Sequence, residues 1–412
     1  MLTNICRNCV LGDNEFVGLK FENGQPIVYF PRGYKVETQN EDNARKDIIN
    51  LLAVLYRFRE SLDGEKNLSK KGNNLSSFPL LSYQHIIRDF LLHGYYIEKE
   101  AEFLKASRGK INWKRTIQQI QPQINDGNIV YLDFIIKTQK NNDNSLLTRI
   151  HEYCVYESFK KLGWLYLGSD SLPLKPQIKL NKKVFLSVLQ SALSNTFNDN
   201  KRNLLKSMIN IISQASENIT DTVEPSFGVY RFEYVWESLI DYVFGEDNIE
   251  RFFPHAKWHI AAQSGYIEQS SALEPDTIIC LDDKLFIIDA KYYKFGITNR
   301  ASDLPATSSI QKQITYGDYA FEHLGYKKNK IYNAFVMPFD KTRYNDENYK
   351  FVSVGTADWE IYDNNTPNHK FVLGILLDTR YIMETFMRHN SNEIETLANL
   401  IITALAEYRK TE

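Results

Sequence analysis

The sequence predicts an α/β protein built in three parts, and three observations lead to that fold class. Residues 1–60 open with short apolar runs of strand length. Residues 61–222 show mainly helical spacing, interrupted by polar loops. Residues 223–412 mix helical patterns with several apolar strand candidates, an order that favours a mixed central sheet. We therefore expect a small N-terminal β subdomain, a mostly helical middle region and a C-terminal α/β domain.

Length and composition agree with a multidomain globular protein. The chain has 412 residues, of which 43% are hydrophobic and 24% charged, so it can build more than one core. Its formal net charge of −2 argues against a wholly basic nucleic-acid coat protein, whereas a local basic groove stays compatible with it. No run of about 18 apolar residues occurs, and the four cysteines are scattered. We expect a cytoplasmic protein with reduced thiols and no membrane span.

Strands and helices are expected in turn along the first two parts. Residues 16–21 and 26–31 are apolar runs on either side of the Asn-Gly dipeptide at 23–24, which is typical of tight β-hairpins. Residues 45–59 carry apolar side chains at helical spacing, and the Asn-, Ser- and Lys-rich residues 61–79 indicate a surface loop. In the middle region, helices are expected over residues 83–92, 146–162 and 179–215.

Helical and strand patterns alternate in the C-terminal part. Helices are expected over residues 232–244, 309–324 and 393–408. Strands are expected over residues 258–262, 277–281, 285–290, 330–338 and 371–377.

Two of these strands meet in a hairpin that brings three charged residues together. A two-residue loop at 282–283 pairs residues at equal distances on its two sides, so Asp276 faces Asp289. Their Cβ atoms are then roughly 4.5–5.5 Å apart. Lys291 follows Asp289 by two positions, so strand alternation places it on the same face.

Two carboxylates and an ammonium at one place suit metal-assisted phosphodiester hydrolysis. Carboxylates this close repel each other, and a hard divalent cation such as Mg²⁺ removes the repulsion. The metal would polarise the scissile phosphate and lower the pKa of a bound water, while Lys291 would orient that water and stabilise the developing charge. The alternative is a structural pair of buried charges. Charges beside the apolar residues 287–288 and 292–293 are costly to bury without compensation, which favours the functional interpretation.

The set of Asp276, Asp289 and Lys291 resembles the PD-(D/E)xK nuclease motif residue by residue. The resemblance covers residues 225–340 best and implies a restriction-endonuclease-like core within residues 223–412. It also implies that Asp276 and Asp289 bind Mg²⁺ and that Lys291 positions the attacking water.

The neighbouring helices extend this resemblance. The helix after the hairpin carries Gln313 and Tyr316 on one face, which is similar to the Gln-containing helix of many such nucleases. The helix before it resembles the one that supplies an additional acid, and of its two glutamates we favour Glu237 over Glu233. The resemblance implies supporting catalytic roles for Glu237, Gln313 and Tyr316.

Motifs upstream resemble one group of these nucleases, the LlaJI-type restriction endonucleases. They are Phe-Val-Gly-Leu at 16–19, Phe-Pro-Arg-Gly-Tyr at 30–34 and Arg-Gly-Lys-Ile-Asn-Trp-Lys-Arg-Thr at 108–116. A more distant similarity links the chain to the McrC subunit of modification-dependent restriction systems.

The resemblance implies site-specific double-strand cleavage of foreign DNA. Since one such site cuts one strand, a second nuclease copy would be needed. In related systems a separate AAA+ GTPase subunit drives translocation, and this chain has no Gly-x-x-x-x-Gly-Lys-Ser/Thr loop, so that motor would be another polypeptide. The alternatives are a McrC-like nuclease subunit of a GTP-driven complex and a non-catalytic DNA-binding protein with a nuclease fold.

A basic run in the middle region is a candidate DNA contact. Residues 105–115 contain five Lys or Arg residues, one Trp and no acid. Cations with an interleaved aromatic suit phosphate and base contact, which predicts DNA binding by Lys110, Trp113, Lys114 and Arg115. The alternative is a solvated loop with one packed tryptophan.

Overall fold

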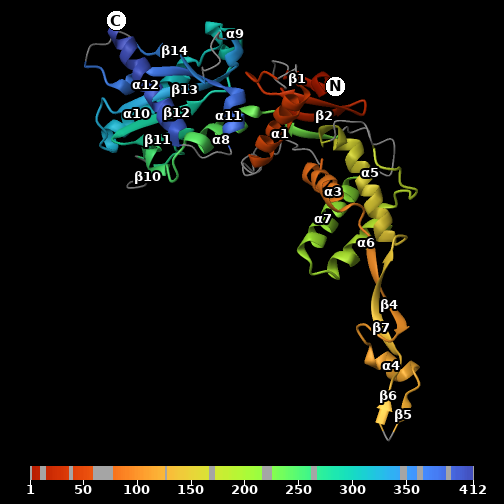
Figure 1. The fold of residues 1–412 in the computed structure, drawn as a ribbon. Helices are drawn as coiled ribbons and strands as arrows, with labels where there is room; N and C mark the ends of the chain where they lie inside the picture. The colour runs from red at the N-terminus through yellow and green to blue at the C-terminus, as the bar shows by residue number, and fades with distance from the viewer. Residues whose placement is uncertain are drawn as a thin grey trace. The chain divides into compact units, whose positions relative to one another are not determined.

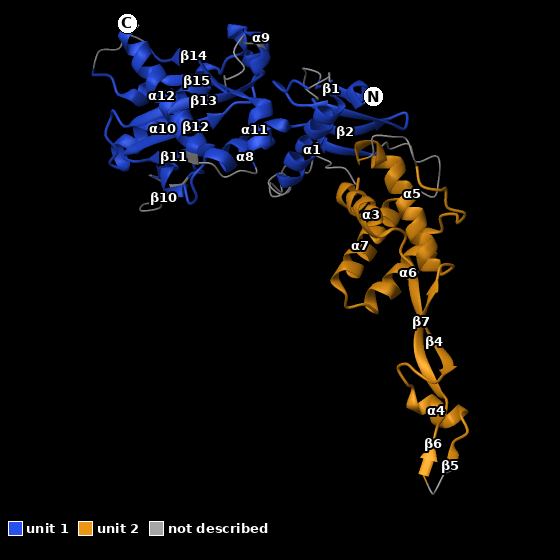
Figure 2. Cartoon of the chain, in the orientation of Figure 1, with its two compact units in different colours: residues 1–77, 224–412 blue, residues 78–223 orange. Residues whose placement is uncertain are grey.

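The computed structural model forms two compact units, and each is described by itself. It describes residues 2–9, 15–36, 40–58, 78–125, 128–166, 172–215, 225–260, 267–343, 350–359, 365–386 and 391–411. The first unit combines residues 1–77 with residues 224–412, and the second comprises residues 78–223 (Figure 2). The sequence suggested three parts, whereas here the N-terminal segment belongs to the same compact unit as the C-terminal α/β part.

A four-stranded sheet joins the two chain segments of the first unit. Its spatial order is β1 (Cys6–Asn8), β3 (Gln25–Phe30), β2 (Val17–Glu22) and β8 (Ser226–Val229). β2 and β3 form the expected hairpin, and the turn residues Asn23 and Gly24 both have positive φ, as a type I′ turn requires. β8 pairs antiparallel with β2, where Gly18 faces Gly228. A Cβ on Gly18 would lie 2.3 Å from the Phe227 carbonyl oxygen, so this close approach needs glycine.

A five-stranded mixed sheet forms the centre of the C-terminal part (Figure 1). Its spatial order is β11 (Thr277–Leu281), β12 (Lys284–Ala290), β13 (Ile331–Phe339), β15 (Val372–Asp378) and β14 (Phe351–Ala357). The three central strands are parallel, and both edge strands are antiparallel to their neighbours. This confirms the mixed α/β sheet expected from the sequence, to which the structure adds β14.

Helices pack on the two sheets and close the core of the first unit. They are α1 (Glu41–Arg57), α8 (Phe232–Phe244), α9 (Phe295–Thr298), α10 (Thr307–His323), α11 (Thr379–Thr385) and α12 (Ser391–Thr411). Ile314 of α10 packs on Phe335 of β13, and Tyr316 joins a cluster with Ile287 of β12. The buried Trp236 of α8 donates its indole N–H to the Val336 carbonyl at 3.2 Å, which fixes α8 beside β13.

Short elements complete the first unit. They are the 3₁₀ turns Leu2–Ile5, Glu250–Phe252, Ala301–Asp303, Lys341–Arg343 and Asn368–Lys370, and the paired strands β9 (Lys257–His259) and β10 (Ile267–Gln269).

The second unit combines helices with a long two-stranded arm (Figure 1). Its main helices are α3 (Leu80–His93), α5 (Leu146–Tyr166), α6 (Lys182–Ser194) and α7 (Asp199–Gln214). The arm pairs β4 (Glu98–Ala106) with β7 (Phe134–Asn142), and it carries α4 (Trp113–Gln119) and the small hairpin of β5 (Gln123–Asn125) and β6 (Asn128–Val130). The helices agree with the mostly helical middle region expected, and the arm is a feature that the sequence did not reveal.

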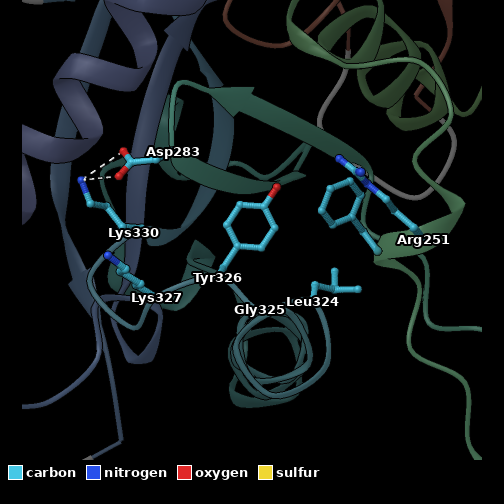
Figure 3. A pocket seen from close by; sticks show the side chains of 8 residues that line it. Arg251, Asp283, Leu324, Gly325, Tyr326, Lys327 and Lys330 are labelled. Atoms are coloured by element: carbon cyan, nitrogen blue, oxygen red, sulfur yellow. Dashed lines mark hydrogen bonds and ion pairs between the residues drawn. The ribbon is translucent and has the colours of Figure 1, made fainter.

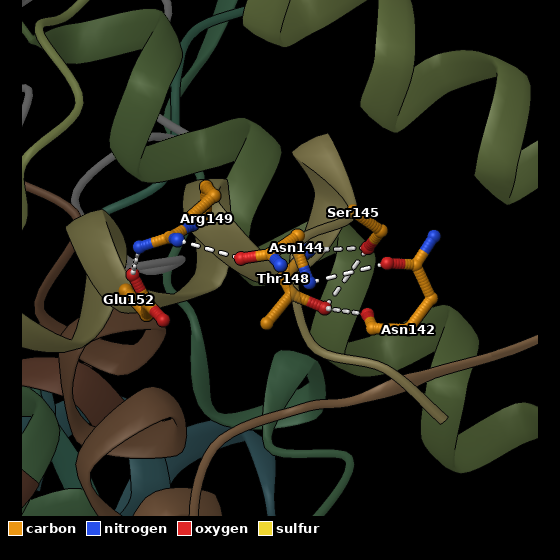
Figure 4. A network of polar contacts seen from close by, with 6 residues as sticks. All are labelled: Asn142, Asn144, Ser145, Thr148, Arg149 and Glu152. Carbon is orange, nitrogen blue, oxygen red and sulfur yellow. Dashed lines mark hydrogen bonds and ion pairs between the residues drawn. The ribbon is translucent and has the colours of Figure 1, made fainter. Parts of the chain in front are cut away.

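A polar network fixes the junction between the arm and α5 (Figure 4). The Ser145 hydroxyl accepts the Thr148 amide at 3.1 Å and so caps the first turn of α5. Arg149 bridges the Asn144 side chain at 2.9 Å and the Glu152 carboxylate at 3.4 Å. These bonds end the strand and start the helix at a defined angle.

None of the described helices combines the length and the apolar composition that a membrane crossing requires.

Candidate functional site

The register of the β11–β12 hairpin brings the two predicted acids together. Thr277 pairs with Ile288 and Leu281 with Lys284, so the two-residue loop lies at 282–283 as the sequence predicted. Asp276 directly precedes β11 and therefore stands opposite Asp289 near the end of β12. One Asp276 carboxylate oxygen accepts the Ala290 amide at 2.8 Å, which holds it in this position.

Lys291 completes the group of charges. Its Nζ lies 2.5 Å from the Asp289 carboxylate, as strand alternation predicts for residues two positions apart. Alternation also places Asp289 on the same face of β12 as Ile287, whose side chain packs with Tyr316 of α10. The three residues thus lie at the end of a rigid sheet, beneath α10.

Burial and neighbouring charges shift the pKa values of Asp276 and Lys291. Asp289 is only 1% exposed, and its Oδ1 has no hydrogen-bond partner among the described residues. Burial raises the pKa of the Asp276 carboxyl well above its usual range, the Asp289 carboxylate adds to the rise, and Lys291 opposes it. Burial alone would lower the pKa of Lys291, but the Asp289 carboxylate outweighs it and raises that pKa.

Gln313 and Tyr316 reach the same place from α10, and both bind main-chain atoms. Gln313 is fully buried and donates from its amide nitrogen to the Ile287 carbonyl of β12 at 2.7 Å. The Tyr316 hydroxyl donates to the Glu274 carbonyl at 2.7 Å, two residues before Asp276. Burial, reinforced by the nearby Asp289 and Asp276 charges, raises the pKa of the Tyr316 hydroxyl, so it stays protonated. The pair therefore positions the two strands that carry the acids.

A hollow of about 440 Å³ lies beside Lys291. Glu233 and Glu237 both line it, but Glu233 accepts a hydrogen bond from the Arg231 guanidinium at 2.6 Å. The Glu237 charge contributes to the raised pKa of Asp276. The choice of Glu237 over Glu233 as the additional acid stays a prediction.

Arg32 also lines this hollow, although the sequence motifs predicted no role for it. Arg32 makes two bonds to the Glu15 carboxylate, at 2.8 and 2.5 Å, and both side chains are nearly buried. It also donates to the Tyr292 carbonyl at 2.5 Å, one residue after Lys291. In the sequence, the Phe-Pro-Arg-Gly-Tyr motif at 30–34 marks this arginine. Its contact with Tyr292 could not be predicted, because the two residues are 260 positions apart.

A second hollow, of about 480 Å³, lies at the opposite end of the hairpin (Figure 3). Its wall includes Arg251, Tyr326, Lys327 and the ion pair of Lys330 with Asp283 at 2.9 Å. Among the described residues that line it, Asp283 is the single carboxylate, and Lys330 neutralises it. This hollow therefore lacks the paired acids that two-carboxylate metal chemistry needs.

The predicted DNA contacts lie on the arm of the second unit. Trp113 opens α4, is 54% exposed and packs edge-to-face on Phe134 with ring centres 5.7 Å apart. The Arg115 guanidinium lies 3.7 Å over the Phe103 ring, so part of its role is packing. Lys110 and Lys114 are exposed on the same stretch.

The donor set beside Lys291 is suited to a cation that keeps several waters. No cluster of three or more His, Cys, Asp or Glu side chains that could hold a metal occurs among the described residues. Mg²⁺ is commonly bound through one or two carboxylates plus water and substrate phosphates. Asp276 and Asp289, with an unpartnered buried oxygen on Asp289, fit that pattern.

Comparison with known proteins identifies the class of protein. Residues 16–365 match the LlaJI restriction endonuclease family, and the chain belongs to that family, as its motifs indicated. It is 25% identical over 363 residues to the type II restriction enzyme BsuMI component YdjA of Bacillus subtilis (strain 168). This alignment covers 84% of this chain and 76% of that protein.

The chain is also similar to a solved structure. It is a refined half-complex from a tetradecameric assembly of Thermococcus gammatolerans McrB AAA+ hexamers with bound McrC. The match has 17% identity and a TM-score of 0.38, and it covers 92% of this chain and 83% of that chain.

Proposed function

We propose that the chain is a Mg²⁺-dependent restriction endonuclease with a PD-(D/E)xK-type core, which hydrolyses phosphodiester bonds of foreign DNA at a specific site. Membership of the LlaJI family supports the substrate class. The observation that carries the chemistry is the convergence of Asp276, Asp289 and Lys291 at one end of the β11–β12 hairpin.

Each residue of this group has a distinct role in the proposal. Asp276 and Asp289 would hold Mg²⁺, which would polarise the scissile phosphate and activate a bound water. Lys291 orients the attacking water and stabilises charge that develops on the phosphate, because its ammonium lies within the same hydrogen-bonded group. Glu237 adds negative charge on the side of the hollow.

Gln313 and Tyr316 support the reaction through the main chain. Their bonds to the Ile287 and Glu274 carbonyls fix the two strands at the level of the acids. Preorganised positions matter because a displacement of about 1 Å can cost a hundredfold in rate.

Double-strand cleavage requires a second active site. One group of this kind cuts one strand, so two copies of the chain would act together on duplex DNA. The relative YdjA is described as a component of a restriction enzyme, which supports a function together with other polypeptides.

A separate AAA+ GTPase subunit is the further partner that we propose to test. The arm of the second unit exposes several large apolar side chains, which a protein partner would cover. They include Trp113, Ile117, Ile124, Ile129 and Leu132. In a McrC-like arrangement, alternative to independent cleavage, DNA would be cut only when the GTPase and GTP are present.

The test of the function compares two aspartates of the same hairpin. Asp289→Asn removes a proposed metal ligand, and Asp283→Asn changes an exposed acid at the other end, where it pairs with Lys330. Each protein is assayed with and without the GTPase. Under both conditions we expect Mg²⁺-dependent cleavage by wild type and by Asp283→Asn, and no cleavage by Asp289→Asn. Equal cleavage by Asp289→Asn would refute the site assignment. DNA binding without cleavage by all three proteins under both conditions would favour the non-catalytic alternative.

A further inference from the structure

Lys291 directly follows β12, at the point where the chain leaves the sheet. The Lys291 amide donates to the Val336 carbonyl at 2.8 Å, which is the last ladder bond of that strand to β13. The chain then turns, since the Tyr293 amide donates back to the Lys291 carbonyl at 2.7 Å. Beyond Lys291, the main chain therefore depends on other contacts for its position.

Arg32 supplies those contacts at Tyr292. Its guanidinium donates to the Tyr292 carbonyl and lies 4.8 Å from the centre of the Tyr292 ring. Its backbone N–H donates to the Tyr292 hydroxyl at 2.6 Å. The Tyr292 ring is buried against Phe232 and Trp236, with ring centres 5.3 and 6.3 Å away.

Both the side chain and the main chain of Arg32 are held in place. The Glu15 carboxylate binds it with two hydrogen bonds, and the Thr379 hydroxyl donates to the Arg32 carbonyl at 2.9 Å. Gly33 allows this close approach, because a Cβ there would lie 2.7 Å from the Thr379 hydroxyl oxygen and 2.8 Å from the Phe339 main chain. The Arg32–Glu15 pair thus forms a rigid support behind the lysine.

We propose that Arg32 is a positioning residue for Lys291, and that Glu15 orients Arg32 for this task. Resting on the proposed nuclease function, the inference assigns a role to the Phe-Pro-Arg-Gly-Tyr motif: it sets where the Lys291 ammonium lies relative to Asp289. Arg32 acts through the main chain of Tyr292 and leaves the chemistry to the residues beyond it.

Arg32→Lys is the informative substitution. Lysine keeps a positive charge beside the buried Glu15, so the carboxylate stays compensated. An ammonium lacks the planar fork that binds Glu15 twice and the Tyr292 carbonyl at the same time. Arg57→Lys is the matched control, because Arg57 also lies over a tyrosine ring, Tyr242, at 5.0 Å.

Cleavage kinetics separate positioning from substrate binding. For Arg32→Lys we expect kcat to fall by about 10- to 100-fold. We expect KM, and DNA affinity measured with Ca²⁺ in place of Mg²⁺, to change less than about twofold, since the DNA-contacting groups remain. Wild-type kcat in a folded Arg32→Lys protein would overturn the proposal, even if its Tm falls. Weakened DNA affinity with unchanged kcat would also overturn it, by showing that Arg32 contacts DNA.

A second measurement does not depend on cleavage. The rate at which an acylating reagent modifies Lys291, followed by peptide mass spectrometry, reports how firmly the ammonium is held by Asp289. We expect several-fold faster modification in Arg32→Lys and the wild-type rate in Arg57→Lys. If wild type does not cut DNA at all, the proposed function fails, and the acylation rates still decide whether Arg32 positions Lys291.

Tyr292→Phe provides an independent variant should Arg32→Lys fail to fold. It removes the hydroxyl that accepts the Arg32 N–H and keeps the ring, the carbonyl and the Arg32–Glu15 pair. We expect a smaller fall in kcat and a smaller rise in acylation rate, in the same directions. Wild-type values of both quantities in this variant would overturn the inference.

Discussion

The Lys291 ammonium lies 2.5 Å from the Asp289 carboxylate at the buried end of β12. This pair is asymmetric, because Asp276 stands opposite Asp289 and adds a second acid to one lysine. With two ionised acids and one nearby ammonium, the group carries a net negative charge, which favours the binding of a further cation such as a divalent metal. In the described residues, the buried Oδ1 of Asp289 has no hydrogen-bond partner.

Removing the lysine charge tests its proposed role directly. In Lys291→Met we expect single-turnover cleavage to fall by at least about 100-fold, because the charge developing on the phosphate loses its stabilising cation. Lys294→Met, three residues further on, serves as the control and should cut at nearly the wild-type rate. A Lys291→Met protein that folds and cuts as fast as wild type would contradict the role of Lys291.

The pH dependence of stability should reveal the raised pKa of Asp276. The folded protein holds this proton more tightly than the unfolded chain, so the free energy of unfolding falls as pH rises from the ordinary Asp pKa toward the raised one. Asp276→Asn has no proton to lose. In EDTA we therefore expect the variant to be more stable than wild type, by little at pH 5 and by more at pH 8. Each kcal/mol corresponds to about 2–4 °C in Tm.

One neighbouring group needs its own control in that experiment. Burial also raises the pKa of Asp241, to about 6, so its titration overlaps the lower part of the same pH window. Asp241→Asn measures that contribution separately. A stability difference between Asp276→Asn and wild type that stays constant from pH 5 to pH 8 would contradict the raised pKa of Asp276.

The Tyr316 hydroxyl should matter for rate more than for folding. Tyr316→Phe keeps the buried ring and loses the bond to the Glu274 carbonyl, which costs about 1 kcal/mol of stability. Because this bond fixes the chain just before Asp276, we expect cleavage to slow by about tenfold or more at unchanged DNA affinity. Tyr319→Phe, on the same helix, is the matched control. Unchanged cleavage by Tyr316→Phe would show that the bond is structural alone.

The arrangement of Asp276, Asp289 and Lys291 could be predicted from the sequence because all three lie in or next to one hairpin. A two-residue loop fixes the register of its hairpin, so Asp276, Asp289 and Lys291 could be aligned from their positions along the chain. The bounds of α8 and the positions of Gln313 and Tyr316 on one helix follow from helical spacing in the same way.

The contacts that the sequence did not reveal are long-range or lack a hydrophobic pattern. β8 pairs with β2 across about two hundred residues, and Arg32 contacts Tyr292 across 260. No pattern in either pair of segments predicts which residues they contact. The arm strand β4 is rich in Glu and Lys and mostly exposed, so it lacks the apolar alternation of a half-buried strand. β14 contains a bulge and the positive-φ Gly355, which interrupt the same alternation.

The last prediction concerns Lys110 and Lys114 on the arm, whose side chains are exposed. If they meet the DNA backbone, each charge removed should weaken binding to all sequences about equally. The slope of log affinity against log salt concentration should then become less steep by about 0.9 for each phosphate that is no longer neutralised by a lysine. Lys160→Ala on the exposed face of α5 is the control and should leave the slope unchanged.

Two further variants separate charge from packing on the arm. Trp113→Ala should lower affinity with little change in slope, because stacking releases no counterions. Arg115→Ala should lower stability as well, since its guanidinium packs over Phe103. Affinities measured at several salt concentrations decide between these outcomes. An unchanged slope in the Lys110→Ala/Lys114→Ala double variant would show that these lysines do not contact DNA. That result is expected for a solvated loop, and also for a McrC-like arrangement in which another subunit binds the DNA.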